Sequence, residues 1–467
     1  MIRFLSDYGF DAYMYAPKDD PYHRALWRED YPESLSIKLR ELVEASNLYS
    51  VDFIFTVSPG LSVKYSDRKE LDLLLKKLRT AVDMGCRWIG VLLDDIDTEL
   101  RFEEDRKAFS TLARAHAYLV NATREELQKN QNVRVSFCPT YYANDYLGKS
   151  VRDNEYLSEI GTEMRNDIDV LWTGRHVVSA KITEADVLEY EKVVRRKPLL
   201  WDNYPVNDYF RSDERDLGLR LNLGPFARRE PRVLDHLAGY LSNPMNESEA
   251  SKISLVTLID MLENPQGYSP TDSMERALDR LFGTSSRARG EMRILIEAAK
   301  ASPFDPDEAV ELKRLVDRAI SSYGKSLEEE WQLNESALRS HLEDCFALKE
   351  NLRSNLQNKK LYFELEPVLS KLKKYAMLGT KSLDYVDTVR SNKRDADSIT
   401  KAELDLAAEE VKKDKIQVLG EINFGTHSDL RNETYDTDDV SALGIPYFRS
   451  ESPVMKLYEW ARELHPL

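Results

Sequence analysis

The chain has 467 residues, 42% of them hydrophobic and 32% charged, which is typical of a globular protein with long solvated helices. Its formal net charge of -16 argues against a nucleic-acid-binding surface, because such surfaces gather Lys and Arg. Three scattered cysteines exclude a disulfide framework or a four-ligand zinc site, and no apolar run reaches the roughly 20 residues that span a bilayer, so we expect a cytoplasmic protein without membrane partners.

The first half of the chain alternates β-rich runs with amphipathic helical patterns, which is typical of parallel βα units. MIRFLSDYG reads as the end of a helix. Seven strands are then predicted, each ending in polar or Gly/Pro residues, near 11–17, 50–59, 87–95, 133–140, 167–174, 198–205 and 237–244.

This alternation predicts a TIM (β/α)8 barrel over residues 1–268, an α/β fold that is one strand short of the full count. We expect the missing first strand to precede Met1, where a targeting signal would also lie. An open doubly wound sheet is the structural alternative, but no Gly-rich phosphate loop follows any strand.

One helix of the first half has clear start and stop signals. Asp67, followed three residues later by Glu70, predicts a capping box, and Gly85 predicts the helix end. Between them lies an apolar stripe of Leu71, Leu74, Leu75 and Leu78.

Beyond the last strand, long helical patterns predict an all-α bundle over residues 269–467. Thr400 with Glu403 predicts one capped helix, and a polar loop near 420–450 precedes a last helix around MKLYEWAREL. Apolar residues recur at a spacing of three and four at Leu338, Leu342, Cys345, Leu348 and Leu352. We expect this bundle to add no catalytic group and to be a possible homodimer interface.

Active sites of barrel enzymes form at the carboxyl ends of the strands, and these ends are unusually polar here. Adjacent carboxylates Asp94 and Asp95 follow the apolar strand IGVLL and suit paired acid/base work, with a metal site or a helix cap as the alternative. Lys18 precedes Asp19 and Asp20, so it suits a ligand contact or a structural ion pair equally.

Strand residue Trp201 is followed by Asn203 and Asp208, which would be poor core residues. An aromatic face with an amide and a carboxylate is a combination that binds sugars, because pyranose CH groups stack on rings and hydroxyls need directional partners. Core filling by Trp201 is the alternative.

A set of motifs, one per strand end, gives a more specific indication. Together they resemble glycoside hydrolase family 84, which contains O-GlcNAcases and related bacterial hexosaminidases. The motifs are YMYAPKDDPYHRALWREDYP at 13–32, SPGL at 58–61, LLDDID at 92–97, FCPTYY at 137–142, LWTG at 171–174, WDNYPVNDY at 201–209 and LSNPMN at 241–246.

The resemblance implies a retaining β-N-acetylglucosaminidase that needs no metal or cofactor and acts on a GlcNAc-bearing glycoprotein or glycoside. In that reading Asp94 orients the substrate's acetamido group, Asp95 is general acid and then general base, and the acetamido oxygen is the nucleophile. The resemblance also implies sugar contacts for Lys18, Tyr142, Trp201, Asn203, Asp208 and Asn243.

One departure from the family concerns its first strand, which ends in a G-F-Y-G-x-P-W type motif that this chain lacks. A non-catalytic GlcNAc-binding or scaffold protein is therefore the alternative function. Release of the aglycone from a chromogenic GlcNAc glycoside distinguishes the two.

Overall fold

The structure is a computed structural model of the chain, and it describes residues 1–129, 132–208, 211–212, 215–216, 220–284, 286–299, 309–324, 328–391, 399–413 and 452–464. The chain divides into two compact units. The first comprises Met1–Asn203 and Arg228–Ser242. The second comprises Tyr204–Ala227 and the described residues from Asn243 onward.

The first unit is built on a seven-stranded parallel sheet in the order β1-β2-β3-β4-β7-β8-β11. The strands are β1 (Ala12–Tyr15), β2 (Asp52–Val57), β3 (Trp88–Leu92), β4 (Arg134–Cys138), β7 (Ile168–Trp172), β8 (Leu199–Asp202) and β11 (Gly239–Ser242). All seven predicted strands are confirmed. A short antiparallel hairpin, β5 (Asp145–Tyr146) with β6 (Lys149–Ser150), follows β4 and was not predicted.

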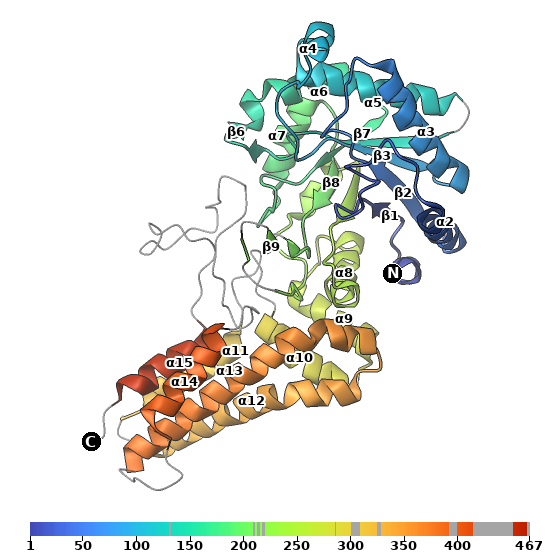
Figure 1. Cartoon of the computed structure of the whole chain (residues 1–467). Helices are drawn as coiled ribbons and strands as arrows, with labels where there is room; N and C mark the ends of the chain where they lie inside the picture. Colours follow the sequence, from blue (N-terminus) through green and yellow to red (C-terminus); the bar gives the residue numbers. More distant parts are fainter. Residues whose placement is uncertain are drawn as a thin grey trace. The chain divides into compact units, whose positions relative to one another are not determined.

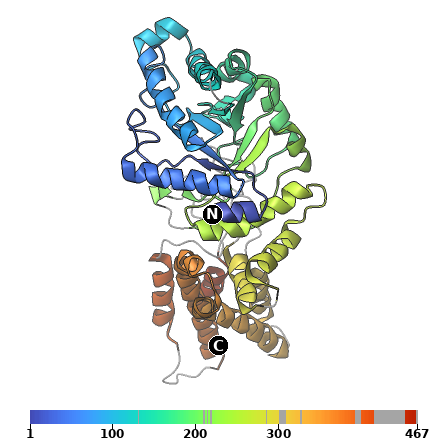
Figure 2. The ribbon, with the colours of Figure 1, turned by 90° about the vertical axis from the view of Figure 1, so that its right-hand side faces the viewer.

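The helices of this unit surround the curved sheet, as Figures 1 and 2 show. They are α1 (Ile2–Asp7), α2 (Glu33–Leu48), α3 (Arg68–Met84), α4 (Glu103–Phe109), α5 (Leu112–Gln128), α6 (Glu155–Glu163) and α7 (Glu184–Val194), with short 3-10 helices at Val151–Asp153 and Pro231–His236. Every residue of β3 is buried, as expected for a parallel strand covered on both faces. The fold is a TIM-like barrel whose described part contains seven parallel strands.

Helix α3 shows how the sequence sets one element. Asp67 caps its start by accepting a hydrogen bond from the Lys69 amide (2.9 Å), and Gly85 ends it in the left-handed region at φ +116°. The predicted capping box is wrong, because the Glu70 carboxylate pairs with the Arg28 guanidinium instead. The predicted apolar stripe is confirmed by the burial of Leu71, Leu74, Leu75 and Leu78.

The second unit is mainly helical in its described residues. Its helices are α8 (Ser248–Glu263), α9 (Pro270–Phe282), α10 (Arg287–Ala299), α11 (Val310–Ser322), α12 (Glu328–Asn355), α13 (Lys359–Ser391), α14 (Lys401–Lys413) and α15 (Pro453–Glu463), and two-residue strands β9 (Arg211–Ser212) and β10 (Arg215–Asp216) pair antiparallel. Among the described helices, none is both long and apolar enough to cross a bilayer.

Three helical predictions for this unit are confirmed. The stripe on α12 is buried, and Thr400 and Glu403 form the predicted capping box at the start of α14. The last predicted helix is α15. The predicted polar loop near 420–450 lies outside the described residues, and the predicted domain boundary after residue 268 stays a prediction.

Candidate active site

The candidate site residues of the first unit lie at one edge of the sheet, where the carboxyl ends of parallel strands meet. Lys18 follows β1, Asp94 and Asp95 follow β3, and Tyr142 follows β4. Asn203 follows β8 directly. This edge is the one at which barrel enzymes carry their catalytic groups.

The ends of β3 and β4 are tied together just before the two aspartates. The Leu93 amide donates to the Cys138 carbonyl (2.9 Å), and the Thr140 hydroxyl donates to the Leu93 carbonyl (2.8 Å). Both bonds fix the backbone from which Asp94 and Asp95 project.

Asp95 has an unusual backbone conformation. Its φ is +49°, in the left-handed region that Asp and Asn tolerate better than most residues. The Arg24 guanidinium donates to the Asp95 carbonyl (2.9 Å) and so supports this turn. Strained backbone of this kind is often found at active sites, since the surrounding structure must hold it in place.

The Asp95 carboxylate is bound at both oxygens. The Lys18 ammonium pairs with Oδ2, and the Tyr142 hydroxyl donates to Oδ1 (2.9 Å). Burial acts to raise the pKa of Asp95, but the charge of Lys18 and these hydrogen bonds outweigh it and hold the pKa below its usual value.

Asp94 lies in a different electrostatic environment. Burial, assisted by the negative charge of Asp95, raises the pKa of Asp94 above its usual value, although Lys18 opposes the shift. Two neighbouring carboxylates are thus held with their pKa values moved apart, a pattern that often marks an acid/base pair.

The ion pair of Lys18 is with a different carboxylate from its sequence neighbours, and its predicted sugar contact stays a prediction. Its ammonium pairs with Asp95 and not with Asp19 or Asp20. Asp20 instead accepts hydrogen bonds from the Tyr15 hydroxyl, the Tyr31 hydroxyl and the Tyr22 amide, each 2.8 Å long. The ion pair is therefore with a candidate catalytic group.

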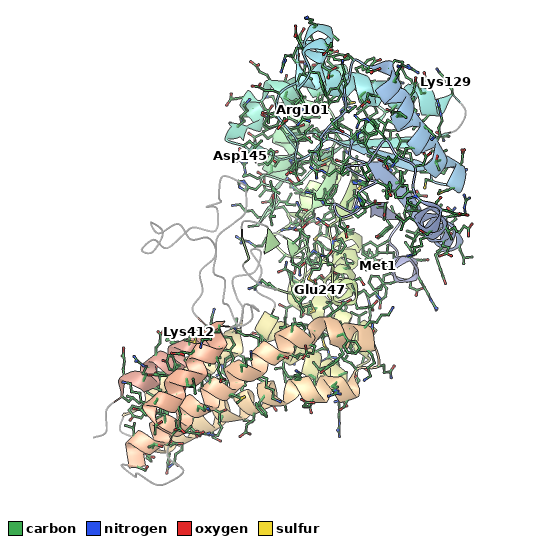
Figure 3. All side chains as sticks on the ribbon, viewed as in Figure 1. Met1, Arg101, Lys129, Asp145, Glu247 and Lys412 are labelled. Atoms are coloured by element: carbon green, nitrogen blue, oxygen red, sulfur yellow. The ribbon has the colours of Figure 1, made fainter. Side chains whose placement is uncertain are left out.

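Sequence reasoning missed two residues of this cluster, Arg24 and Tyr146. The Tyr142 hydroxyl lies 3.2 Å from that of Tyr146, and the two rings are 4.6 Å apart between centroids. Tyr146 belongs to the hairpin that begins at Asp145, labelled in Figure 3, and no sequence pattern had indicated that hairpin. Arg24 lies inside the motif at 13–32, shortly after Lys18, and this position could have suggested a role in the site.

Behind the strand ends lies a buried hydrogen-bond chain. The Thr140 amide donates to the Tyr156 hydroxyl (3.2 Å), which lies 2.8 Å from Nδ1 of His116, and Nε2 of His116 lies 2.9 Å from the Tyr65 hydroxyl. Burial lowers the pKa of His116 to about 3, so the ring is neutral and fixes the loop that carries Tyr142.

At the end of β8, successive side chains have different surroundings. Trp201 is half-buried against the core, and Asn203 donates to the Val177 carbonyl (2.6 Å). Between them, Asp202 is fully buried and accepts two hydrogen bonds from Arg229, at 2.9 and 2.7 Å. This buried pair holds the strand end that presents the two candidate sugar-binding residues.

The remaining two candidates, Asp208 and Asn243, fall in the second unit. Asp208 is exposed, and the Asn243 carbonyl accepts a hydrogen bond from the Val206 amide (2.8 Å). Their part in the site stays a prediction. Among the described residues, no group of three or more His, Cys, Asp or Glu could hold a metal ion.

Comparison with known proteins identifies the family. The family model for beta-N-acetylglucosaminidase, named NAGidase, matches residues 1–297. The chain belongs to this family.

Relatives of this NAGidase-family chain include the Protein O-GlcNAcases of Rattus norvegicus and Mus musculus. Each is 36% identical over 258 residues, which are 55% of this chain and 27% of the relative. The chain thus spans about a quarter of the length of these curated relatives.

Solved structures resemble the NAGidase-family chain over more of its length. A variant of the Thermobaculum terrenum O-GlcNAc hydrolase has a TM-score of 0.75 and 30% identity, covering 88% of this chain and 89% of that one. CpGH84B has a TM-score of 0.74 and 28% identity, covering 89% of this chain and 71% of that one. These likenesses support the TIM-like barrel with a helical part.

Proposed function

We propose that the chain is a β-N-acetylglucosaminidase that hydrolyses terminal β-linked GlcNAc with retention of configuration. Family membership supports the activity. The observation that supports the mechanism is the position of Asp94 and Asp95, adjacent at the carboxyl end of β3, with the Asp95 carboxylate held by Lys18 and Tyr142. The names of the curated relatives favour GlcNAc on a protein as the substrate.

The reaction is substrate-assisted. Asp94 accepts a hydrogen bond from the acetamido N–H, which makes the acetamido oxygen a better nucleophile toward the anomeric carbon. Asp95 donates a proton to the glycosidic oxygen as that bond breaks, and an oxazoline forms as the acetamido N–H proton moves to Asp94, which returns it when the oxazoline opens. Asp95 then takes a proton from the water that opens the oxazoline, so two inversions give net retention.

A general acid must carry a proton, and the position of Lys18 affects whether Asp95 is protonated. Without substrate, the Lys18 ammonium pairs with Asp95 and lowers its pKa. If Lys18 turns to a sugar hydroxyl, Asp95 loses this cation, and its pKa rises toward the range in which it can act as an acid. Sugar binding would thereby prepare the acid.

The other candidates complete the proposal. Tyr142 lies against the acetamido group and holds Asp95, while Trp201 forms the pocket wall and Asn203 binds sugar hydroxyls. Asp208 and Asn243 would also bind sugar hydroxyls.

The proposal also covers the domains. Residues 1–268 act as the catalytic domain and 269–467 as a helical domain without catalytic groups, and a homodimer through the helical bundle is the predicted assembly. The three cysteines are free and buried, which supports a cytoplasmic location.

The test measures which anomer is released and how the rate of hydrolysis depends on the nucleophilicity of the acetamido oxygen. On 4-nitrophenyl β-GlcNAc, NMR should detect the β-anomer first. Replacing the acetyl group by fluoroacetyl, difluoroacetyl and trifluoroacetyl should slow hydrolysis stepwise, because fluorine makes the carbonyl oxygen a poorer nucleophile. Equal rates across the series, or equal turnover of the glucoside without an acetamido group, would contradict substrate assistance. Binding of GlcNAc without release of 4-nitrophenol would favour the non-catalytic alternative.

A further inference from the structure

The hairpin of β5 and β6 places a further tyrosine against Tyr142. Its two-residue turn, Leu147 and Gly148, has the left-handed backbone that such turns require, with φ values of +52° and +72°. Tyr146, the residue just before the turn, is 9% exposed, and its ring lies 4.6 Å from that of Tyr142 between centroids. The two hydroxyls are 3.2 Å apart. The hairpin therefore brings one more hydroxyl group to the residue that holds Asp95.

A hairpin of two-residue strands is too small to be rigid by itself, so its position depends on its anchors. The Asp145 amide donates to the Arg175 carbonyl (2.8 Å), and the Arg175 guanidinium donates to the Asp145 carboxylate (2.9 Å). The same guanidinium donates to Asp186 of α7 (2.8 Å), a residue that is only 2% exposed. These bonds fix the hairpin, and with it Tyr146, to the segment after β7 and to α7.

The number of protons in this chain of hydroxyls sets its direction. A tyrosine hydroxyl has a single proton to donate. The Tyr142 proton goes to Oδ1 of the Asp95 carboxylate, at 2.9 Å, because a charged acceptor makes the stronger hydrogen bond. The longer contact is then a donation from the Tyr146 hydroxyl to the Tyr142 oxygen. The result is a directed chain from Tyr146 through Tyr142 to Oδ1. The other oxygen of Asp95, Oδ2, pairs with the Lys18 ammonium.

We propose that Tyr146 is a positioning residue that selects which oxygen of Asp95 carries the catalytic proton. By donating to Tyr142, it keeps the Tyr142 hydroxyl turned toward Oδ1 as a donor, so a proton on Asp95 has to be on Oδ2. Without Tyr146, the Tyr142 hydroxyl could turn away from Asp95 and accept a proton from Oδ1 instead. The catalytic use of the proton rests on the proposed function, whereas the direction of the chain does not.

Selection of Oδ2 determines when the acid forms. In the free protein the Lys18 ammonium occupies Oδ2, so the proton and Lys18 compete for the same oxygen. Asp95 therefore becomes protonated as Lys18 leaves for a sugar hydroxyl, which couples formation of the acid to bound substrate. The other charged groups that face Asp95 are the Arg24 guanidinium, which binds its carbonyl, and the neighbouring Asp94 carboxylate, whose pKa the charge of Asp95 raises.

The first test measures the protonation of Asp95 directly and does not depend on activity. The full chain is labelled with 13C at its aspartate carboxyl carbons, and the Asp95 signal is assigned as the one missing from Asp95→Asn. In Tyr146→Phe the pKa of Asp95 should rise, because Tyr142 then donates less strongly to the carboxylate. Tyr141→Phe removes a hydroxyl from the neighbouring ring, which takes no part in the chain, and it should leave the pKa of Asp95 unchanged.

A double-variant cycle shows whether Tyr146 acts through Tyr142. Tyr142→Phe should also raise the pKa of Asp95, and adding Tyr146→Phe to it should cause no further rise, because the connecting hydroxyl is gone. An unchanged pKa in Tyr146→Phe, or an equal rise with and without the Tyr142 hydroxyl, would overturn the proposal. Phenylalanine keeps the ring packed on Tyr142, so Tyr146→Phe should retain the fold, and thermal unfolding of each variant checks this.

The second test is hydrolysis of two substrates by the full chain. On phenyl β-GlcNAc, Tyr146→Phe should lower kcat about threefold or more with little change in KM, since the contribution of about one net hydrogen bond is lost. On dinitrophenyl β-GlcNAc, kcat should be unchanged, because this leaving group needs little protonation. The basic limb of kcat/KM on the phenyl substrate should move to higher pH with the pKa of Asp95. A loss of equal size on both substrates, or a change in KM alone, would overturn the selecting role.

Failure of this proposal and failure of the proposed function give different results. A chain without hydrolase activity would contradict the proposed function, and the 13C titration would still decide whether Tyr146 acts on Asp95. A raised pKa of Asp95 with unchanged kcat on the phenyl substrate would confirm the hydrogen-bond chain but overturn its part in proton transfer.

Discussion

Replacing Asp95 by asparagine tests the division of labour between the two aspartates. Asparagine has the same shape and tolerates the left-handed backbone found here, at φ +49°, whereas alanine would add about 1 kcal/mol or more of strain. The new amide could still accept a hydrogen bond from the Tyr142 hydroxyl but could not deliver a proton. The side chains of the lost ion pair with Lys18 are 61% and 35% exposed, so folding stability should change by less than about 1 kcal/mol.

The catalytic effect should be much larger than the effect on stability. General acid catalysis contributes about 10^2 to 10^4-fold, or roughly 3 to 5 kcal/mol of barrier. That loss should appear on aryl β-GlcNAc glycosides with poor leaving groups, such as phenol, and nearly vanish with dinitrophenol, which needs little protonation. Asp94→Asn should instead lose a similar factor on every substrate, because it acts on the acetamido group.

The assay is kcat/KM across a series of aryl glycosides, with thermal unfolding of each variant as the control for folding. If both variants lost one constant factor across the series, the two roles would not be separable. A glycosyl ester trapped on either aspartate would also refute the acetamido group as the nucleophile.

Three further outcomes are expected. In the Asp95→Asn variant the pKa of Asp94 should fall, because a neighbouring negative charge is removed. The acid limb of kcat/KM on the dinitrophenyl substrate should therefore move to lower pH, and an unmoved limb would contradict the coupling of the two aspartates. Asp202→Asn should destabilise the fold by about 3 to 5 kcal/mol in denaturant unfolding, because it leaves Arg229 buried without its counter-charge. Adding Arg229→Met should recover part of this loss. If Asp202→Asn alone were as stable as the unchanged protein, the pair would have no structural role. Burial gives His116 a folded-state pKa of about 3, below its unfolded value of 6.5, so its contribution to the free energy of unfolding is complete above pH 6.5 and is lost as pH falls. The loss should be about 2 kcal/mol between pH 6.5 and 5. The stability of His116→Phe should decline less over that range, and parallel stability curves for the two proteins would contradict the neutral buried ring.

The strand positions were predictable because each strand is a short apolar run that ends in polar residues. The same alternation placed Lys18, Asp95 and Tyr142 at one edge of the sheet, and the structure brings these three side chains together. Their roles, in contrast, came from the family resemblance, because two adjacent carboxylates alone are equally compatible with a cap or a metal site.

Several features depend on contacts between distant residues and could not be predicted. Glu70 has the spacing of a capping box, yet a guanidinium 42 positions away binds it more strongly than the local amide does. Tyr146 lies in a hairpin of two-residue strands, too short to leave a periodic pattern. Lys77 belongs to an ordinary helical pattern, and only tertiary packing shows that its ammonium is buried.

The left-handed backbone at Asp95 also has an evolutionary consequence. The residues that this conformation accepts without strain are glycine, asparagine and aspartate, and two of these three cannot transfer a proton. One nucleotide substitution in an aspartate codon suffices for either replacement. Lineages descended from such an enzyme could therefore lose turnover while the barrel stays folded, and the identity of residue 95 would be the first position to inspect in a homologue suspected of being a pseudoenzyme.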